Sequence, residues 1–367
     1  MSRIYTNIKK SLLTTVVVSV ISIIGMNQTA FAAQDNWYPY TVDVWLESFN
    51  MKSERASYSY IPLDKAKKKH KICVSFPHMK DAYWLAVNYG VAQESKRLGV
   101  RMHLVEAGGY TNLKKQISQI EDCVSAGAKA VIIGGISAKG LRNTVKQLSK
   151  KGIPVIDVVN GISSSKLSAK SLVSFGEMGL KAGKYLAEKH ALGTAEAQTA
   201  WFPGPAGAGW VEAGNKGFSN GIKGSAIKLV TTRYGDTGKG TQAKLIEDAI
   251  STYPNLKYIA GTAVTAEVAI GILKSKGLSD KIQVIAYYMT PGVFSGIKKG
   301  TVLAAPTDST VIQGRIAIDQ AVRILEGKPY VKHVGPSLYM VDKSSLESFD
   351  QSTALAPKGF KPVFDVK

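Results

Sequence analysis

The chain has 367 residues, 45% of them hydrophobic, and its 47 basic against 27 acidic side chains give a formal net charge of +20. The length exceeds what one compact domain usually holds, so two lobes with a packed core are expected. A basic balance of this size would ordinarily suggest nucleic acid as the partner. We exclude that class, because the N-terminal residues indicate export and no helix-turn-helix pattern precedes the first expected strand.

Residues 1–32 have the pattern of a signal peptide. A basic start is followed by the apolar run LLTTVVVSVISIIG, and AFA at positions 30–32 supplies a small-x-small cleavage pattern. An uncleaved membrane anchor is the alternative, but the run is short for a bilayer, and no later segment reaches spanning length. Cleavage after Ala32 removes three basic residues and no acidic one, so the charge falls from +20 to +17. We expect a periplasmic protein whose mature chain has no membrane span.

Residues 33–69 form an irregular stretch that is rich in aromatic residues. It contains NWYPYTVDVWLESF and SYSYIP and ends in the polar run DKAKKKHK. No clean helical or strand period runs through it. We interpret it as an N-terminal extension rather than a domain.

From residue 71 onward the pattern alternates between strands and helices. The first half predicts strands at residues 71–77, 101–108, 130–136 and 153–159, with helices between them. The alternation restarts with strand-like runs at residues 171–176, 187–193, 199–204, 228–235, 257–263, 282–288 and 301–307. Two runs of βα units predict an α/β fold of two doubly wound parallel-sheet lobes with a hinge and an interlobe cleft.

The two expected lobes are each discontinuous in the sequence. The N-terminal lobe comprises residues 70–160 and about 288–307, and the C-terminal lobe comprises about 161–287 and 308–345. Residues 346–367 form a C-terminal tail. Ligands of doubly wound sheets bind outside the carboxyl ends of the strands, so a ligand is expected in the cleft.

The chain has two cysteines, Cys73 and Cys123. In an oxidising compartment a disulfide is the economical interpretation, and a buried reduced pair is the alternative. Cys73 lies in the first expected strand and Cys123 in the last turn of the second expected helix, so the two can be neighbours. Two isolated thiols do not predict a metal site, and the five histidines show no metal-ligand spacing.

Three short motifs suggest catalysis or phosphate binding, and each fails on its context. GFSNG, residues 217–221, matches a nucleophile elbow at Ser219, but the residues before it predict a helix where the elbow needs a strand. GDTGKGT, residues 235–241, lacks the first glycine of a phosphate loop, and PGPAGAGW, residues 203–210, lacks dinucleotide spacing. We therefore expect no enzyme and no cofactor, with a secreted hydrolase using Ser219 as an alternative.

Aromatic side chains recur where the expected strands end. Tyr83 and Trp84 follow the first strand, Trp210 follows the Gly-rich loop, and Tyr234 and Tyr288 end later strands. A further tryptophan, Trp45, lies in the extension. An aromatic box suits a methylated cation, although it also serves sugars and apolar ligands.

Several segments resemble the type I periplasmic binding proteins of the ribose-binding kind. They are IPVIDVVN at 153–160, FGEMGLKAGKYLAEK at 175–189 and the long run at 285–314 that ends the last strands. CVSFPHMKDAYWLAVNYG, at 73–90, with VEAGGYTNLKKQISQIEDC, at 105–123, is similar to the sensor branch of that family. That branch binds trimethylamine N-oxide and presents it to the periplasmic domain of a membrane sensor histidine kinase.

The chain departs from the sugar binders of this family at their polar contacts. It has GTAVTAE, at 261–267, where they carry Asn-Asp, Tyr288 where they carry Asp, and Trp210 where they carry Arg. A pocket without these partners rejects polyols, because their hydroxyls would be buried unpaired. The resemblance implies trimethylamine N-oxide as the ligand. The candidate ligand-binding residues are Tyr83, Trp84, Tyr288, Trp45, Trp210, Asp43, Asp308 and Tyr234.

The function that follows is a sensor accessory protein. Ligand binding would change the arrangement of the lobes, and the changed surface would favour one state of the kinase. The alternative is the solute-binding component of an ABC transporter for a small methylated amine or a sugar. The aromatic extension favours signalling, because transporter components usually begin at the first strand soon after the signal peptide.

Overall fold

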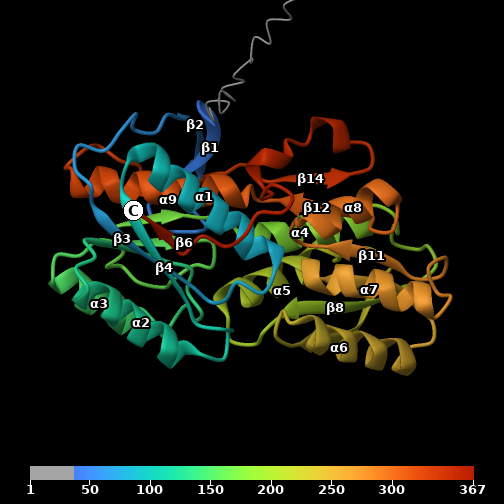
Figure 1. The fold of residues 1–367 in the computed structure, drawn as a ribbon. Coiled ribbons are helices and arrows are strands. Elements are labelled where there is room, and N and C mark those ends of the chain that lie inside the picture. The colour runs from blue at the N-terminus through green and yellow to red at the C-terminus, as the bar shows by residue number, and fades with distance from the viewer. Residues whose placement is uncertain (1–36) are drawn as a thin grey trace, which may run out of the picture. The chain divides into compact units, whose positions relative to one another are not determined.

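Figure 1 shows the computed structural model, which describes residues 37–367. The predicted signal peptide, residues 1–32, lies outside the described residues. The strands are β1 (Tyr40–Trp45), β2 (Arg55–Tyr60), β3 (Lys71–Phe76), β4 (Arg101–Glu106), β5 (Ala130–Ile133), β6 (Val155–Val158), β7 (Ala169–Ser171), β8 (Ala197–Gly204), β9 (Ile227–Tyr234), β10 (Leu256–Gly261), β11 (Gln283–Ala286), β12 (Ala304–Thr307), β13 (His333–Pro336), β14 (Tyr339–Asp342) and β15 (Asp365–Val366). The helices are α1 (Ala82–Leu98), α2 (Leu113–Ser125), α3 (Arg142–Lys150), α4 (Phe175–Ala187), α5 (Gly209–Gly221), α6 (Lys239–Thr252), α7 (Ala263–Ser275), α8 (Pro291–Lys299) and α9 (Thr310–Leu325).

The first sheet has the strand order β15-β4-β3-β5-β6-β7-β13-β1-β2. Its centre, from β4 to β13, is parallel, whereas β15, β1 and β2 add antiparallel edges. The central strands β5 and β6 are buried along their whole length, because helices cover both faces of the sheet (Figure 1). Four of the predicted strands, at 71–77, 101–108, 130–136 and 153–159, lie in this sheet.

The second sheet has the order β11-β10-β8-β9, and all its strands are parallel. β12 pairs with β14, and the Leu303 amide donates to the Val284 carbonyl at 2.8 Å, which attaches this short pair to the edge at β11. α4 packs on α5, and α7 packs on α6 and α8. The predicted α/β class with two parallel-sheet lobes is confirmed.

Two predicted strands of the second half are wrong. At residues 187–193 helix α4 ends at Ala187 with Glu188 as its C-cap, and the chain then makes a single bridge between Ala191 and Ser225 and turns at Gly193, whose φ is 89°. Of residues 171–176, only Ser171 belongs to a strand, because β7 ends there. Ser174 there caps α4 by accepting a hydrogen bond from the Glu177 amide at 3.2 Å.

The structure divides the later residues between the lobes differently from the expectation. Residues 288–307 were expected in the N-terminal lobe, but β12 joins β14 beside the second sheet. Residues 308–345 were expected in the C-terminal lobe, but α9 packs on α1, and β13 pairs with β7 and β1 in the first sheet. The alternation of strands and helices does not specify which sheet a strand joins, because that depends on pairing between distant residues.

The N-terminal extension is an ordered part of the first lobe. β1 and β2 form a hairpin, and β1 pairs with β13 in antiparallel register. Trp37 stacks on Tyr60 with ring centroids 6.0 Å apart, and its Nε1 donates to the buried Glu94 carboxylate at 2.9 Å. These contacts fix the segment before β1 to α1.

A buried carboxylate on α9 fastens the end of the hairpin. Asp319 is fully buried and accepts hydrogen bonds from the Tyr60 hydroxyl and from the Leu63 amide at 2.8 Å. Arg323 pairs with the same carboxylate at 2.6 Å. Because the Asp319 carboxylate is buried, water cannot replace these partners. The extension is therefore held to α9 by this carboxylate.

Asp319→Ala is expected to lower the free energy of unfolding by about 3 kcal/mol, because it leaves Arg323 without its carboxylate and two donors without an acceptor. Tyr60→Phe removes one donor and keeps the ring, so it should cost only about 1 kcal/mol. Urea denaturation of both variants measures the difference. Equal losses in the two variants would show that the other partners of the carboxylate contribute nothing.

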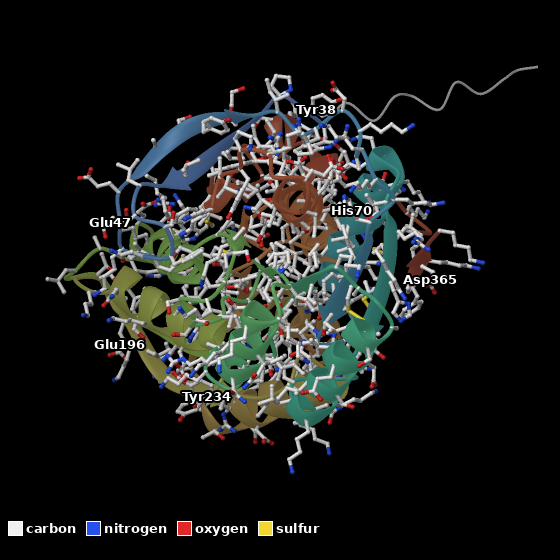
Figure 2. The ribbon with its side chains drawn as sticks, turned by 90° about the vertical axis from the view of Figure 1, so that its left-hand side faces the viewer. Tyr38, Glu47, His70, Glu196, Tyr234 and Asp365 are labelled. Atoms are coloured by element: carbon white, nitrogen blue, oxygen red, sulfur yellow. A yellow bond between two sulfur atoms is a disulfide. The ribbon has the colours of Figure 1, made fainter. Side chains whose placement is uncertain are left out.

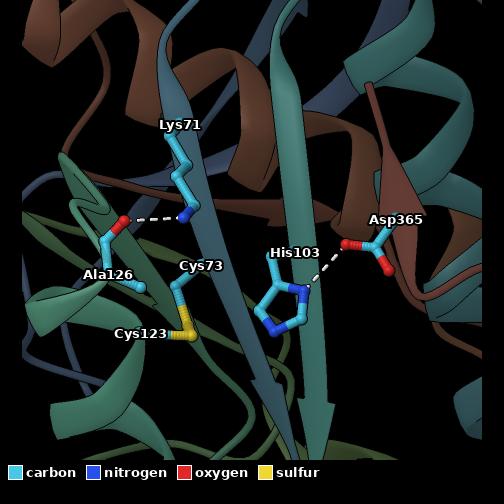
Figure 3. Close-up of a disulfide and its surroundings, with 6 residues drawn as sticks. All are labelled: Lys71, Cys73, His103, Cys123, Ala126 and Asp365. Carbon is cyan, nitrogen blue, oxygen red and sulfur yellow. Dashed lines mark hydrogen bonds and ion pairs between the residues drawn. A yellow bond between two sulfur atoms is a disulfide. The ribbon is translucent and has the colours of Figure 1, made fainter.

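The predicted disulfide is confirmed. Cys73 in β3 and Cys123 in the last turn of α2 are bonded, with their Cα atoms 6.0 Å apart (Figure 3). Beside it, Lys71 donates to the Ala126 carbonyl at 2.6 Å, which adds a second contact between the start of β3 and the end of α2. The bridge holds α2 against β3, which is the strand that leads into α1.

Candidate functional site

A small cavity lies between the two lobes, at the carboxyl ends of their strands. Its walls come from loops and first helical turns on both sides of the cleft. The lining residues are Asp81, Tyr83, Trp84, Tyr110, Asn160, Phe175, Trp210, Thr237 and Tyr288. Four of them, Tyr83, Trp84, Trp210 and Tyr288, were predicted from the sequence as ligand-binding residues.

The helix cap of α1 sets the first wall. Asp81 is the N-cap residue, and its carboxylate accepts a hydrogen bond from the Trp84 amide at 3.1 Å. This cap starts the helix directly after β3, so Tyr83 and Trp84 lie in its first turn, where both are buried. The aromatic pair therefore owes its position to the short connection between strand and helix.

Glycines set the second wall by letting α4 and α5 approach closely. A side-chain carbon on Gly217 would overlap the Gly176 carbonyl, and one on Gly179 would overlap the Gly214 carbonyl. Phe175 begins α4 and Trp210 lies in the first turn of α5, with ring centroids 5.4 Å apart. The close helix contact therefore places both rings at the cavity.

The same contact explains the Gly-x-Ser-x-Gly motif. Ser219 lies within α5, which begins at Gly209, so helical residues and not a strand precede it. Gly217 and Gly221 serve the packing against α4, where a side-chain carbon on either would meet backbone atoms. The motif is a helix-packing feature and lacks the strand that an elbow requires.

The rings around the cavity meet mainly edge to face. Tyr83 and Tyr288 have centroids 5.0 Å apart at 69°, and Trp210 and Tyr288 have centroids 6.3 Å apart at 79°. Tyr110 lies 5.8 Å from Trp210. Such an arrangement presents ring faces from several directions to anything held between them.

The polar groups of the cavity are few. Burial raises the pKa of Asp81 to about 6, against the lowering effect of its hydrogen bond from Trp84. The Asn160 amide donates to the Tyr110 hydroxyl at 3.0 Å and to the Gly135 carbonyl at 2.8 Å. Trp210 Nε1 is buried and lacks a hydrogen-bond partner of normal geometry among residues 37–367. A donor in that condition favours an acceptor on a ligand.

Asp308 stands behind the wall rather than in it. The Tyr83 hydroxyl donates to its carboxylate, and Gln313 Nε2 donates to the same oxygen at 3.1 Å. Burial raises the pKa of Asp308 to about 6. It lies in the connection from β12 to α9, next to Ser309, whose φ is 47°. Asp308 therefore orients Tyr83 from a segment that crosses between the lobes.

Three other predicted residues do not reach the cavity. Trp45 stacks on His333 in the first sheet, with ring centroids 4.1 Å apart. Asp43 pairs with Arg55 at 3.1 Å and accepts from Ser337. These contacts follow from the hairpin that the sequence did not predict.

Tyr234 ends β9 and is 44% exposed, near the edge of the molecule in Figure 2. The side chain from this loop that does line the cavity is Thr237, three residues later. The tyrosine is thus on the correct loop, but its side chain lies on the outer surface.

Sequence reasoning missed five lining residues: Asp81, Tyr110, Asn160, Phe175 and Thr237. Tyr110 and Asn160 follow strands of the first sheet, so the strand-end rule that selected Tyr83 could have found them. Asp81 shows the signal of a helix cap. No local sequence pattern marks Phe175 or Thr237 as ligand-binding residues. Phe175 begins a helix, and Thr237 lies within a loop.

The lobes are closed over the cavity. Its volume is about 10 Å³, which leaves room for about one water molecule. Across the cleft, Lys80 pairs with Asp236 at 3.2 Å, and the Thr237 hydroxyl contacts buried His78 at 3.3 Å. A larger groove of about 770 Å³ adjoins the cavity and shares the wall residues Asn160, Phe175 and Trp210. Entry of a ligand therefore requires the lobes or this shared wall to move.

Residues 37–367 contain neither a candidate metal-binding cluster nor a membrane-spanning helix. No group of three or more potential ligand side chains occurs among them that could hold a metal ion. None of their helices has the length and hydropathy needed to cross a bilayer.

Residues 72–329 match the profile of the family described as "Periplasmic binding protein domain". The chain belongs to this family. The resemblance expected from the sequence, its fold and its periplasmic location are confirmed. Its relatives are binding proteins, and the site described above occupies the cleft between the two lobes.

Two kinds of relative stand out. The chain is 33% identical to "Periplasmic protein TorT" of Escherichia coli (strain K12) over 300 residues, 82% of this chain and 86% of that protein. Crystal structures of the TorS sensor domain–TorT complex, without ligand and with TMAO, include a chain that is 34% identical, with a TM-score of 0.74, covering 80% of this chain and 99% of that one.

A further solved structure has higher identity. An ABC transporter solute-binding protein from Bradyrhizobium sp. BTAi1, with bound bis-tris, is 62% identical with a TM-score of 0.78. The match covers 89% of this chain and 98% of that one. The chain is therefore similar both to a protein that forms a complex with a sensor domain and to a solute-binding protein of a transporter.

Proposed function

We propose that this periplasmic binding protein binds trimethylamine N-oxide in the aromatic cavity and regulates a TorS-type membrane sensor histidine kinase. The observation that carries the proposal is the composition of the cavity. Aromatic rings from both lobes enclose it, a carboxylate lies at one side, and within residues 37–367 the buried indole donor of Trp210 lacks a hydrogen-bond partner of normal geometry. Closure of the lobes would present the kinase with a changed surface.

Each part of the ligand has a counterpart in this cavity. The three methyl groups can lie against the faces of Trp84, Trp210 and Tyr288, which attract the positive nitrogen. Asp81 supplies a carboxylate to the same positive nitrogen. Trp210 Nε1 can donate to the N-oxide oxygen. A sugar would leave most of its hydroxyls unpaired among these rings.

The relatives agree with an amine-type ligand and a kinase partner. TorT forms a complex with the TorS sensor domain, and one such structure contains TMAO. The 62% identical protein holds bis-tris, which is a hydroxylated tertiary amine. Both molecules carry a substituted nitrogen, which an aromatic cavity can accommodate, and only the amine of bis-tris supports the proposal, because its hydroxyl groups resemble those of a polyol.

Calorimetric titration of the parent protein and the Trp210→Phe variant tests the proposal. The parent should bind trimethylamine N-oxide, and ribose should give no heat. Trp210→Phe keeps an aromatic ring but removes the donor, so its affinity for the N-oxide should fall about 10-fold, the loss of one hydrogen bond. Affinity for tetramethylammonium, which has no oxygen, should change little. No heat with the N-oxide would refute the assignment of the ligand.

The second candidate function is transport. It is favoured by the 62% identity to an ABC transporter solute-binding protein. The two functions share the ligand site and differ in the partner. Purified sensor domain of the cognate kinase should bind this protein with an affinity that depends on the N-oxide, and absence of binding in both conditions would favour the transporter.

Binding of tetramethylammonium is expected to strengthen as the pH rises through about 6. Asp81 attracts a cation only when ionised, and burial raises its pKa to about 6. The ligand itself does not titrate, so apparent affinity should be about 10-fold weaker one unit below this pKa than well above it. Titration at several pH values measures the effect. In Asp81→Asn the affinity should be low and independent of pH, and a parent-like profile in that variant would assign the pH dependence to another group.

A further inference from the structure

The end of the first lobe that faces away from the cleft carries a concentration of basic side chains. Parallel strands begin at this end, and the helices that return from the cleft finish there, so both contribute to one surface. Lys71 begins β3, and Arg101 begins β4 directly beside it in register. Lys129 precedes β5, and its amide donates to the Lys71 carbonyl at 2.8 Å.

The segment before β3 adds three adjacent lysines to this surface. Lys67, Lys68 and Lys69 are all exposed. Their backbone is fixed, because the Lys67 amide donates to the Glu326 carboxylate at 2.6 Å and His70, labelled in Figure 2, contacts the same carboxylate at 3.3 Å. The lysine side chains therefore extend into solvent from an ordered backbone.

Helix ends complete the surface. Lys96 lies in the last turn of α1, and Lys150 and Lys151 lie at the end of α3, all exposed. These positions are also favoured by the helix dipole, which places partial negative charge at a helix C-terminus. We call this surface, made of residues 65–71 and the ends of α1 and α3 with Arg101 and Lys129, the basic pole.

Acidic side chains at this end are fewer. Glu121 and Asp122 lie in the last turns of α2 and are exposed, and Asp64 precedes the lysine run. Asp365 is paired with His103 at 2.8 Å (Figure 3). The basic pole therefore keeps an excess of positive charge.

We infer that the basic pole docks the protein onto an anionic phospholipid surface. Between residues 65 and 71 the only apolar side chain is that of Ala66. Protein interfaces are depleted of lysine and enriched in aromatic residues and arginine, so a second protein is the less suitable partner. Lysine side chains that face an anionic membrane need no aromatic or arginine residue beside them, because the attraction is spread over many charges.

The attraction has a predictable size and salt dependence. Each lysine near an anionic membrane strengthens binding by about five-fold, so three lysines together contribute about 100-fold. The effect decays over a Debye length, about 10 Å at 0.1 M salt. Docking would hold the protein at the membrane with the cleft facing away from the lipid, whatever the ligand, so this inference does not depend on the proposed function.

Vesicle co-sedimentation tests the inference on protein purified from the periplasm. The probes are vesicles of phosphatidylglycerol with phosphatidylcholine, and vesicles of phosphatidylcholine alone. The parent should bind only the anionic vesicles and should be released by salt. The triple variant Lys67→Gln, Lys68→Gln, Lys69→Gln should bind about 100-fold more weakly. Its melting temperature should be unchanged, because the replaced side chains are exposed.

A matched control removes the same charge from the second lobe. Lys274→Gln, Lys276→Gln, Lys299→Gln replaces exposed lysines at the ends of α7 and α8. It should bind anionic vesicles nearly as the parent does. Equal losses in the two triple variants, or parent binding that is absent or insensitive to salt, would overturn the inference. The inference would also be overturned if the triple variant at residues 67–69 kept its binding to vesicles but lost its binding to the kinase sensor domain. That result would make an acidic protein the partner of the basic pole.

Discussion

Gly217→Ala is expected to lower the free energy of unfolding by about 5 kcal/mol, which is as much as a marginally stable domain possesses. The added methyl group would overlap the Gly176 carbonyl, and backbone cannot rotate away as a side chain can. Relief requires α4 and α5 to separate. Because Phe175 and Trp210 begin these helices, the variant should also lose the aromatic wall of the cavity.

Gly271→Ala is the matched control for that prediction. Gly271 lies within α7, and apart from the adjacent backbone of its own helix no atom lies within 4 Å of the position its added methyl would occupy. Alanine should therefore raise the free energy of unfolding by about 0.5–1 kcal/mol, because it restricts the unfolded chain and favours the helix. Urea denaturation followed by circular dichroism measures both variants. A Gly217→Ala protein as stable as the parent would contradict the close contact between α4 and α5.

Removal of the disulfide has the second-largest expected effect. The Cys73→Ala, Cys123→Ala double variant should lose about 4 kcal/mol of unfolding free energy on the chain-entropy model. The bridge spans a sequence separation of 50, so its loss restores much freedom to the unfolded chain. β3 leads into α1, so a loosened strand would also disturb Tyr83 and Trp84.

Reduction provides the internal control for this prediction. Dithiothreitol should lower the stability of the parent by a similar amount and leave the double variant unchanged. Chemical denaturation with and without reductant gives the four values that are needed. If the oxidised parent and the double variant unfold at the same denaturant concentration, the bridge contributes nothing to stability.

Four strands of the first sheet, β3, β4, β5 and β6, could be predicted because their signal is local. The run at residues 130–136 is apolar throughout, and the run at 153–159 is apolar except for Asp157, as is typical of strands covered on both faces. Residues 187–193 show where this signal fails. Apolar residues there are interrupted by charged ones, and a helix end uses the same composition.

The candidate site was predicted in part for a similar reason. Tyr83, Trp84, Trp210 and Tyr288 follow strands or the loops after them, and strand ends meet at the cleft in this class of fold. Trp45 and Asp43 were misplaced because the hairpin that holds them has no clear period in the sequence. Asp308 was predicted as a polar contact of the ligand, but it does not line the cavity, and its side chain accepts a hydrogen bond from Tyr83.

The sequence by itself determined the two-lobed α/β class, the pairing of Cys73 with Cys123 as the economical choice, and the aromatic character of the cleft. These depend on local periodicity, on composition and on the position of residues after strands. Only the tertiary structure decided that α9 joins the first lobe, that β12 joins the second, and that Asp81 and Phe175 face the same cavity. The physical reason is that strand pairing and helix packing join residues far apart in the chain, and no local pattern specifies those partners.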